Sequence, residues 1–187
     1  MLGEQFVLAV IPARGGSKRV PRKNIRLFRG EPLIAWTIYA AMDSKYVDKV
    51  VVSTEDAEIA HVARLLGAEV IDRPAELATD TATSEDVLRH ALTVKEGFAW
   101  VVLLQPTSPL RTSKDIDACI DQLQAKRRNT SACISVAPDG KTNGAVYVAE
   151  SSWLQHGHNF NTNYWKATYL MPAERSLDID TEDQLNG

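Results

Sequence analysis

Short apolar runs alternate with longer amphipathic stretches along most of the chain. The runs are rich in branched apolar residues, and several are followed directly by glycine, proline or small polar residues, which is typical of strands buried in a sheet. Six such runs predict strands, at residues 6–11, 50–52, 68–71, 100–104, 132–136 and 145–148.

Between these runs, apolar residues recur every three or four positions, which predicts amphipathic helices. Each predicted helix has a start residue suited to a cap or to the first turn. These start residues are Pro32, Ser53 or Thr54, Thr83 or Ser84, and Ser113. Gly67 follows the last periodic residue of the second helix and should end it.

Strands and helices therefore alternate in units of βαβ size, which predicts an α/β fold. We expect a Rossmann-like, doubly wound, mostly parallel sheet with helices on both faces. The 187 residues suit a single domain spanning residues 1–187. Ligands of such sheets lie beyond the carboxyl ends of the strands, so residues 12–24 and 105–111 should share one site.

The composition narrows the classes of function. There are 24 acidic and 21 basic residues, and the net charge of −3 argues against broad binding to nucleic acids or membrane surfaces. No apolar run is long enough to span a bilayer, and residues 1–4 lack the features of a signal peptide, so we expect a cytoplasmic protein. Cys119 and Cys133 lie among apolar residues and should be core thiols.

The basic residues are concentrated in one loop, where seven of the 21 fall between residues 14 and 29. They are Arg14, Lys18, Arg19, Arg22, Lys23, Arg26 and Arg29. Gly15 and Gly16 would let the backbone approach a ligand, so the loop predicts a polyphosphate site. It matches neither the P-loop nor the Gly-x-Gly-x-x-Gly spacing, which disfavours an ATPase of that type and an NAD enzyme. A solvated basic loop is the alternative.

Asp178 and Asp180 are the candidate metal ligands. Residues two apart in an extended segment point to the same face, so these carboxylates would form a hard-oxygen site suited to Mg²⁺ or Mn²⁺. The alternative is an exposed acidic segment followed by a helix cap at Thr181.

Several segments resemble the CMP-N-acetylneuraminate (acylneuraminate) cytidylyltransferase family in order and spacing. They are Val10–Lys18 with Lys23 and Asn24, Arg73–Ser84, Leu104–Arg111, Asn143–Tyr147 and Ser176–Thr181. The resemblance covers nearly the whole chain. It implies a nucleotidyltransferase that joins CMP from CTP to a sialic-acid-like nonulosonic acid and releases pyrophosphate. Legionaminate and pseudaminate are alternative acceptors, and a CTP-binding module without turnover is a further alternative.

The resemblance also implies a role for each matched residue. The catalytic residues would be Arg14, Lys23 and Asp180. The nucleotide would be bound by Arg14, Gly15, Ser17, Lys18, Lys23, Asn24, Arg73, Ala82 and Ser84. The sugar would be bound by Gln105, Thr107, Ser108, Arg111, Asn143 and Tyr147. The metal would be held by Asp178 and Asp180. Arg73, Ser84 and Gln105 also have ordinary alternatives, as a solvated loop residue, a helix cap and a partner of loop backbone groups.

The chain departs from the family pattern after Val136. It runs through residues 137–142 directly to Asn143, where family members carry a longer insertion that resembles a dimerisation arm. Three explanations stay open: residues omitted from the sequence, a shortened chain, or a natural minimal form. The resemblance implies a homodimer if the full protein carries the arm.

Overall fold

Seven strands form one sheet in the computed structural model, which describes residues 5–17, 19–161 and 166–186. Their order is β5-β4-β1-β6-β8-β7-β9. The strands are β1 (Phe6–Pro12), β4 (Lys49–Thr54), β5 (Glu69–Asp72), β6 (Phe98–Leu103), β7 (Ala132–Val136), β8 (Thr142–Glu150) and β9 (Lys166–Leu170). Only β8 is antiparallel to its neighbours, so the prediction of a mostly parallel sheet is confirmed.

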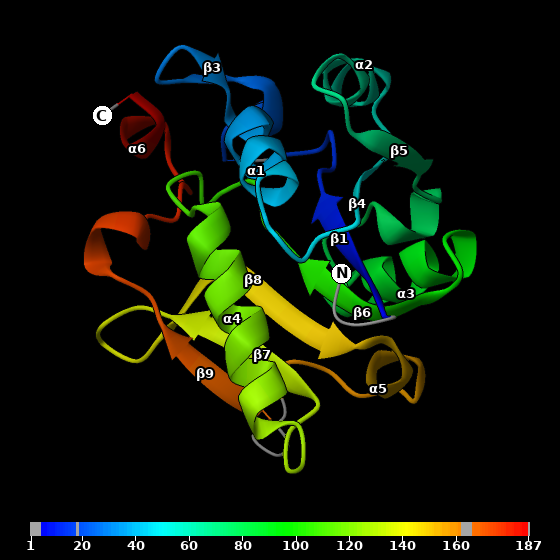
Figure 1. Ribbon diagram of the computed structural model, residues 1–187. Helices are drawn as coiled ribbons and strands as arrows, with labels where there is room; N and C mark the ends of the chain where they lie inside the picture. Colours follow the sequence, from blue (N-terminus) through cyan, green and yellow to red (C-terminus); the bar gives the residue numbers. More distant parts are fainter. Residues whose placement is uncertain (1–4, 18, 162–165, 187) are drawn as a thin grey trace.

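Helices cover both faces of the sheet (Figure 1). They are α1 (Leu33–Met42), α2 (Ala57–Leu65) and α4 (Ser113–Lys126) on one face, and α3 (Ser84–Val94) and α5 (Ser151–Gln155) on the other. The central strand β1 shows why. Val7, Ala9 and Ile11 pack into one core, whereas Leu8 and Val10 pack into the other, because successive side chains alternate across a strand. The doubly wound architecture is therefore confirmed.

Two helix starts differ from the sequence prediction. Strand β4 continues through Thr54, so neither Ser53 nor Thr54 caps α2. Asp56 does so, because its Oδ1 accepts hydrogen bonds at 2.9 and 3.0 Å from backbone N–H groups of the first turn. The cap of α4 is Thr112, one residue before the predicted Ser113. In both cases several adjacent polar residues could act as caps, and the tertiary structure selects one.

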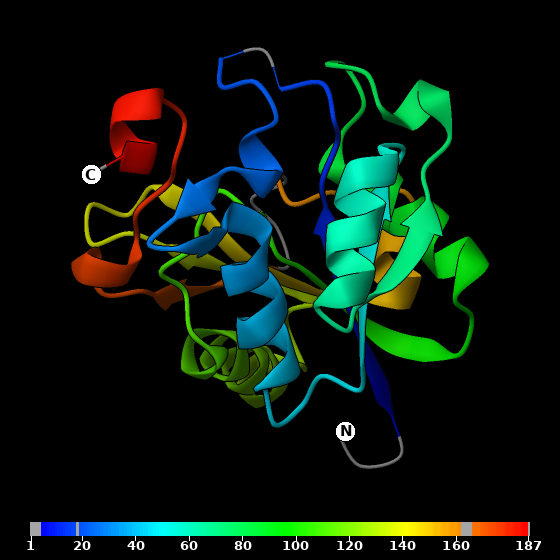
Figure 2. The ribbon, with the colours of Figure 1, turned by 90° about the horizontal axis from the view of Figure 1, so that it is seen from above.

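The C-terminal part of the chain returns to the loop after β1. Helix α6 (Glu182–Asn186) lies beside the small hairpin of β2 (Leu27–Phe28) and β3 (Glu31–Pro32), as Figure 2 shows. A third apolar cluster fastens this contact. Its buried members are Val20, Phe28, Leu33, Ile179 and Leu185. This cluster anchors the Asp178–Asp180 segment near the basic loop.

Strands β7 and β8 are joined by a tight turn at the point where the family pattern predicts an insertion. The Ala137 N–H donates to the Lys141 carbonyl at 2.8 Å, and Gly140 has a φ of +81°, which suits glycine. The connection is therefore a closed hairpin.

The two cysteines are buried free thiols with their Sγ atoms 3.8 Å apart, which agrees with the predicted core positions. Within the described residues, no helix combines the length and apolarity that a membrane crossing requires.

Candidate active site

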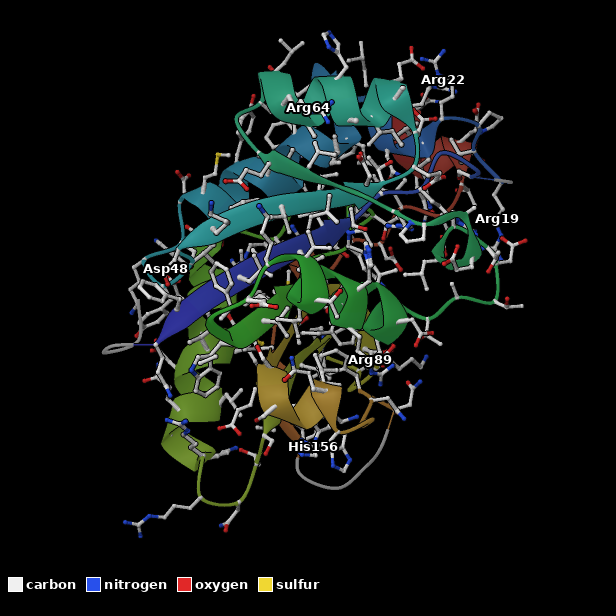
Figure 3. All side chains as sticks on the ribbon, turned by 90° about the vertical axis from the view of Figure 1, so that its right-hand side faces the viewer. Arg19, Arg22, Asp48, Arg64, Arg89 and His156 are labelled. Carbon is white, nitrogen blue, oxygen red and sulfur yellow. The ribbon has the colours of Figure 1, made fainter. Side chains whose placement is uncertain are left out.

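A polar cleft of about 360 Å³ lies beyond the carboxyl ends of β1, β5 and β6. The loops at residues 12–24 and 105–111 both contribute to it, so the prediction that they share one site is confirmed. In Figure 3, Arg19 lies beyond this end of the sheet, and Asp48 lies at the other end. Eleven of the predicted site residues line the cleft: Arg14, Ser17, Lys23, Asn24, Arg73, Ala82, Ser84, Gln105, Thr107, Asp178 and Asp180.

The glycine-containing loop after β1 packs directly on the start of α2. The Gly15 N–H donates to Glu55 Oε1 at 2.8 Å, and a Cβ at Gly15 would lie only 2.5 Å from Asp56 Oδ2. Asn24 braces the loop from the other side by donating to the Arg14 carbonyl at 3.0 Å. Because a side chain at residue 15 would collide with Asp56, glycine is required there for the loop to pack against the start of α2. Lys18, which was also predicted to bind phosphate, lies outside the described residues.

Cations of this loop meet carboxylates from two distant parts of the chain. Arg14 Nη1 lies 2.7 Å from Asp80 Oδ1. Lys23 Nζ donates to the Ile179 carbonyl at 2.9 Å and lies 3.5 Å from Asp180 Oδ1. The basic loop and the acidic segment therefore face each other across one cleft.

The acidic segment, residues 178–180, is held in place by its central residue, Ile179. Ile179 is fully buried, and its N–H donates to the Thr107 carbonyl at 2.7 Å. Asp178 Oδ1 is buried and has no hydrogen-bond partner among the described residues. Burial raises the pKa of Asp178, and the nearby charge of Asp180 raises it further, against the opposing effects of Thr107 and Lys23. An orphaned buried carboxylate oxygen beside a second carboxylate is suited to a cation.

The protein groups that face such a cation are limited in number. Among residues 5–17, 19–161 and 166–186, no group of three or more His, Cys, Asp or Glu side chains could hold a metal ion. A cation at Asp178 and Asp180 would therefore complete its shell with water or substrate oxygens, which is the usual arrangement for Mg²⁺.

The opposite wall of the cleft is the connection from β5 to α3. Arg73 is buried and donates from Nη2 to the Ser53 carbonyl at 2.6 Å, and burial lowers its pKa. Ala82 and Ser84 follow at the N-terminal end of α3, where Thr83 is the helix cap. Thr79 and Asp80 of the same connection also line the cleft, although the sequence pattern did not single them out.

Apart from Tyr147, the predicted sugar-binding residues divide into two groups. Gln105 and Thr107 line the cleft. Three others lie buried behind that loop: Ser108, Arg111 and Asn143. Arg111 donates to the Ala145 carbonyl at 2.8 Å and to the Gln105 carbonyl, and burial lowers its pKa to about 9. These three fix the shape of the loop, and their role in sugar binding stays a prediction.

Tyr147, the last of the predicted sugar residues, is half-buried beside the acidic segment. Its ring centroid lies 5.1 Å from that of Phe160. Burial raises the pKa of Tyr147, and the nearby charges of Asp178 and Glu85 act in the same direction, against the opposing effect of a hydrogen bond with Thr142. The phenol therefore stays protonated.

A mostly parallel sheet whose carboxyl end carries a basic glycine-containing loop facing paired carboxylates is typical of the nucleotidyltransferase class of α/β proteins. Residues 8–162 match the family model described as cytidylyltransferase, and the chain therefore belongs to that family. The solved structure of CMP:2-keto-3-deoxy-manno-octonic acid synthetase in complex with CTP has the same fold. Its TM-score is 0.82 at 18% identity, and the match covers 97% of this chain and 96% of that one.

Two curated relatives illustrate the range of the family. An N-acylneuraminate cytidylyltransferase from Escherichia coli is 33% identical over 206 aligned positions, which cover 93% of this chain and 49% of the relative. A CMP-N,N'-diacetyllegionaminic acid synthase from Legionella pneumophila is 35% identical over 211 positions, covering 94% of this chain and 91% of the relative. This chain thus spans about half the length of the first relative. Because both alignments are longer than the chain itself, the relatives carry additional residues within the aligned stretch.

Proposed function

We propose that this protein transfers CMP from CTP to a nonulosonic acid and releases pyrophosphate. One observation carries the proposal: Lys23, from the basic loop, reaches the Ile179 carbonyl between the two aspartates of the acidic segment. A triphosphate bound by the loop would then lie against Asp178 and Asp180. Family membership and the names of the relatives support the same chemistry.

The roles of the residues follow from their positions around the cleft. Arg14, Ser17 and Lys23 would hold the triphosphate. The Gly15 N–H, which donates to Glu55 in this structure, is proposed for the same group on the basis of its place in the motif. Lys18 is proposed for the same group on the basis of its place in the motif. The ribose and cytosine would be bound by Arg73, Ala82 and Ser84 of the opposite wall, together with Asn24 of the basic loop. Gln105 and Thr107 would contact the sugar acid, and Tyr147 would border it. The loop that carries Gln105 and Thr107 would be kept in shape by Ser108, Arg111 and Asn143.

Asp178 and Asp180 are the residues that would hold Mg²⁺ or Mn²⁺, because they offer paired hard oxygens, one of them buried and unpartnered. When bound, such an ion supplies charge neutralisation for the phosphates and a lower pKa for a coordinated hydroxyl.

The reaction forms a bond between the anomeric oxygen of the acceptor and the α-phosphorus of CTP, breaks the bond from that phosphorus to pyrophosphate, and releases the proton of the anomeric hydroxyl to solvent. Such displacement depends on in-line positioning. Gln105 and Thr107 would orient the acceptor on one side of the phosphorus. Arg14 and Lys23 would stabilise the negative charge that develops on the leaving pyrophosphate.

Two acceptors stand out. N-acetylneuraminate is indicated by the sequence resemblance, and N,N'-diacetyllegionaminate by the relative whose length this chain nearly matches. A homodimer is proposed for a form of the protein that carries the dimerisation arm. A cytoplasmic location fits the substrates of such a reaction.

The test is release of pyrophosphate from CTP and Mg²⁺ in the presence of each candidate acid, with pseudaminate as a third acceptor. Arg14→Ala and Asp180→Ala should each lower turnover by about 10²-fold or more, as expected for loss of a charge-stabilising group. Asp139→Asn, in the turn between β7 and β8, should turn over like the wild type. Near-wild-type turnover in either cleft variant would remove its assigned role. Binding of CTP without turnover for any acceptor would instead support the binding-module alternative.

A further inference from the structure

The phosphate-binding face of the cleft is engaged by one of the chain's own carboxylates. Asp80 lies in the connection between β5 and α3, and its Oδ1 is 2.7 Å from Arg14 Nη1. In Figure 2 this connection (green) lies beside the loop after β1 (blue), at the same end of the sheet. Both side chains are partly exposed to the cleft, at 34% for Arg14 and 47% for Asp80.

A carboxylate and a phosphate make the same kind of charge-assisted hydrogen bond to a guanidinium group. Arg14 is the residue proposed to hold the triphosphate, so Asp80 satisfies it with an internal anion. The two anions carry charge of the same sign, and they cannot both occupy the Nη1 side of Arg14 without repulsion.

The local structure allows Asp80 to move away. The preceding turn η2 (Ala75–Leu77) contains no buried residue. The segment is fastened at its two ends, where Arg73 donates to Ser53 and Thr83 caps α3. Between these points the Thr79 hydroxyl bonds to groups of the same segment, including the Ala82 N–H at 3.2 Å. Residues 74–84 include no buried side chain, so the stretch around Asp80 can shift without disturbing the core.

We propose that Asp80 is an internal competitor for the phosphate site, an inference that rests on the proposed function. In the nucleotide-free protein Asp80 neutralises Arg14 and keeps the guanidinium oriented into the cleft. The triphosphate displaces Asp80 from Arg14 when it binds. Asp80 returns when pyrophosphate leaves, which favours release of this strongly charged product. Asp80 thereby lowers the affinity of the site for both polyphosphates.

The experiment compares Asp80→Asn with the wild type by calorimetric titration with CTP and, separately, with inorganic pyrophosphate, each in Mg²⁺. The variant should bind both ligands about two- to fivefold more tightly, which is the range expected for removing a partly exposed ion pair. Asp139→Asn is the matched control, because it removes the same charge from an exposed ion pair outside the cleft. Its affinities should equal those of the wild type.

An Arg14→Gln background separates competition from a general charge effect. If Asp80 acts through Arg14, adding Asp80→Asn to Arg14→Gln should give no further gain in affinity. Unchanged or weaker binding by Asp80→Asn, or the same gain in the Arg14→Gln background, would overturn the inference. The titrations need no sugar acceptor, so tighter binding without turnover would sustain the competition and reject the proposed reaction. If neither the wild type nor Asp80→Asn bound CTP or pyrophosphate, both the proposed function and the competition by Asp80 would be rejected.

Discussion

Asp115 and Asp86 provide a matched pair in which the same capping arrangement is buried in one helix and exposed in the other. Each carboxylate accepts hydrogen bonds from the backbone N–H and hydroxyl of the threonine that caps its helix. Each also accepts from an arginine, Arg175 or Arg89 respectively. The side chain of Asp115 is fully buried, whereas that of Asp86 is 42% exposed. Asparagine at both positions therefore compares a buried site, where Asp115 also accepts from Tyr169 and twice from Arg175, with an exposed one, where Asp86 accepts once from Arg89.

The structure gives different magnitudes for the two substitutions. Asp115 receives two hydrogen bonds of 2.9 Å from Arg175 and one of 3.0 Å from the Tyr169 hydroxyl. Removing one partner of a buried ion pair costs about 3–5 kcal/mol. Arg175 is 29% exposed and can regain water, so we expect about 3 kcal/mol for Asp115→Asn. Asp86→Asn should cost about 1 kcal/mol, from a weakened cap and a solvated ion pair.

The assay is urea unfolding of the two variants and the wild type at pH 7 and at a series of lower pH values. Burial opposes ionisation of Asp115, but hydrogen bonds from Arg175, Thr112 and Tyr169 outweigh it and hold the pKa of Asp115 below its usual value. A lowered folded-state pKa gives stability that is complete above the unfolded-state pKa of about 4 and is lost as the pH falls through the folded-state value. The difference between wild type and Asp115→Asn should therefore shrink below about pH 4. Equal losses for the two variants at pH 7 would refute the role given to burial.

Three further predictions concern the loop, the acidic segment and the surface. Gly15→Ala should lower the free energy of unfolding by about 1 kcal/mol and weaken CTP binding, because the new Cβ displaces Asp56 from its capping position. Gly16→Ala, where no atom of the described residues lies within 4 Å of the added Cβ, should leave the free energy of unfolding unchanged in the same denaturation assay. Ile179→Ala should cost about 2–3 kcal/mol in urea unfolding and raise the Mg²⁺ concentration needed for half-maximal turnover, because it loosens both flanking aspartates. Two lysines lower the pKa of Glu69 to about 2, so its stabilising contribution should disappear as the pH falls from about 4.5 towards 2, and Glu69→Gln should lack that part of the acid-unfolding profile.

The clearest strand predictions concern the central strands, which are buried on both faces of the sheet, although the edge strand β5 was predicted as well. The central strand β1 and its neighbours β4 and β6 appear in the sequence as unbroken apolar runs, because both surfaces of these strands are covered. Strand β9 was missed. It lies at the edge of the sheet, where its side chains are only partly covered; Leu170, its last residue, is 63% exposed. Its sequence, Lys-Ala-Thr-Tyr-Leu, therefore shows no unbroken apolar run. The short helix α5 was missed for a related reason, since five residues cannot display a helical period.

The site was predictable where its residues belong to a recognisable local pattern. The loop after β1 and the Asp-Ile-Asp segment carry such patterns, and the carboxyl-end rule for parallel sheets brings two of the loops together. Asp80 lies within the Arg73–Ser84 segment of the family resemblance but was given no role there, and Glu55 lies in none of the resembling segments. Their contacts with Arg14 and Gly15 arise because two connections that follow other strands fold over the same strand end. Only the three-dimensional arrangement reveals that the acidic side chains of Asp80 and Glu55 contact the basic loop.

The two halves of the cleft are supported independently and meet through Lys23. Asn24 stabilises the basic loop by donating to the Arg14 carbonyl. The acidic segment is held by the hydrogen bond from the Ile179 N–H to the Thr107 carbonyl. Lys23 Nζ bonds to the carbonyl of that same Ile179, and its side chain is only 13% exposed. Its bond to the backbone therefore orients the segment as well as supplying charge. Lys23 thus connects the basic loop directly to the segment that carries Asp180.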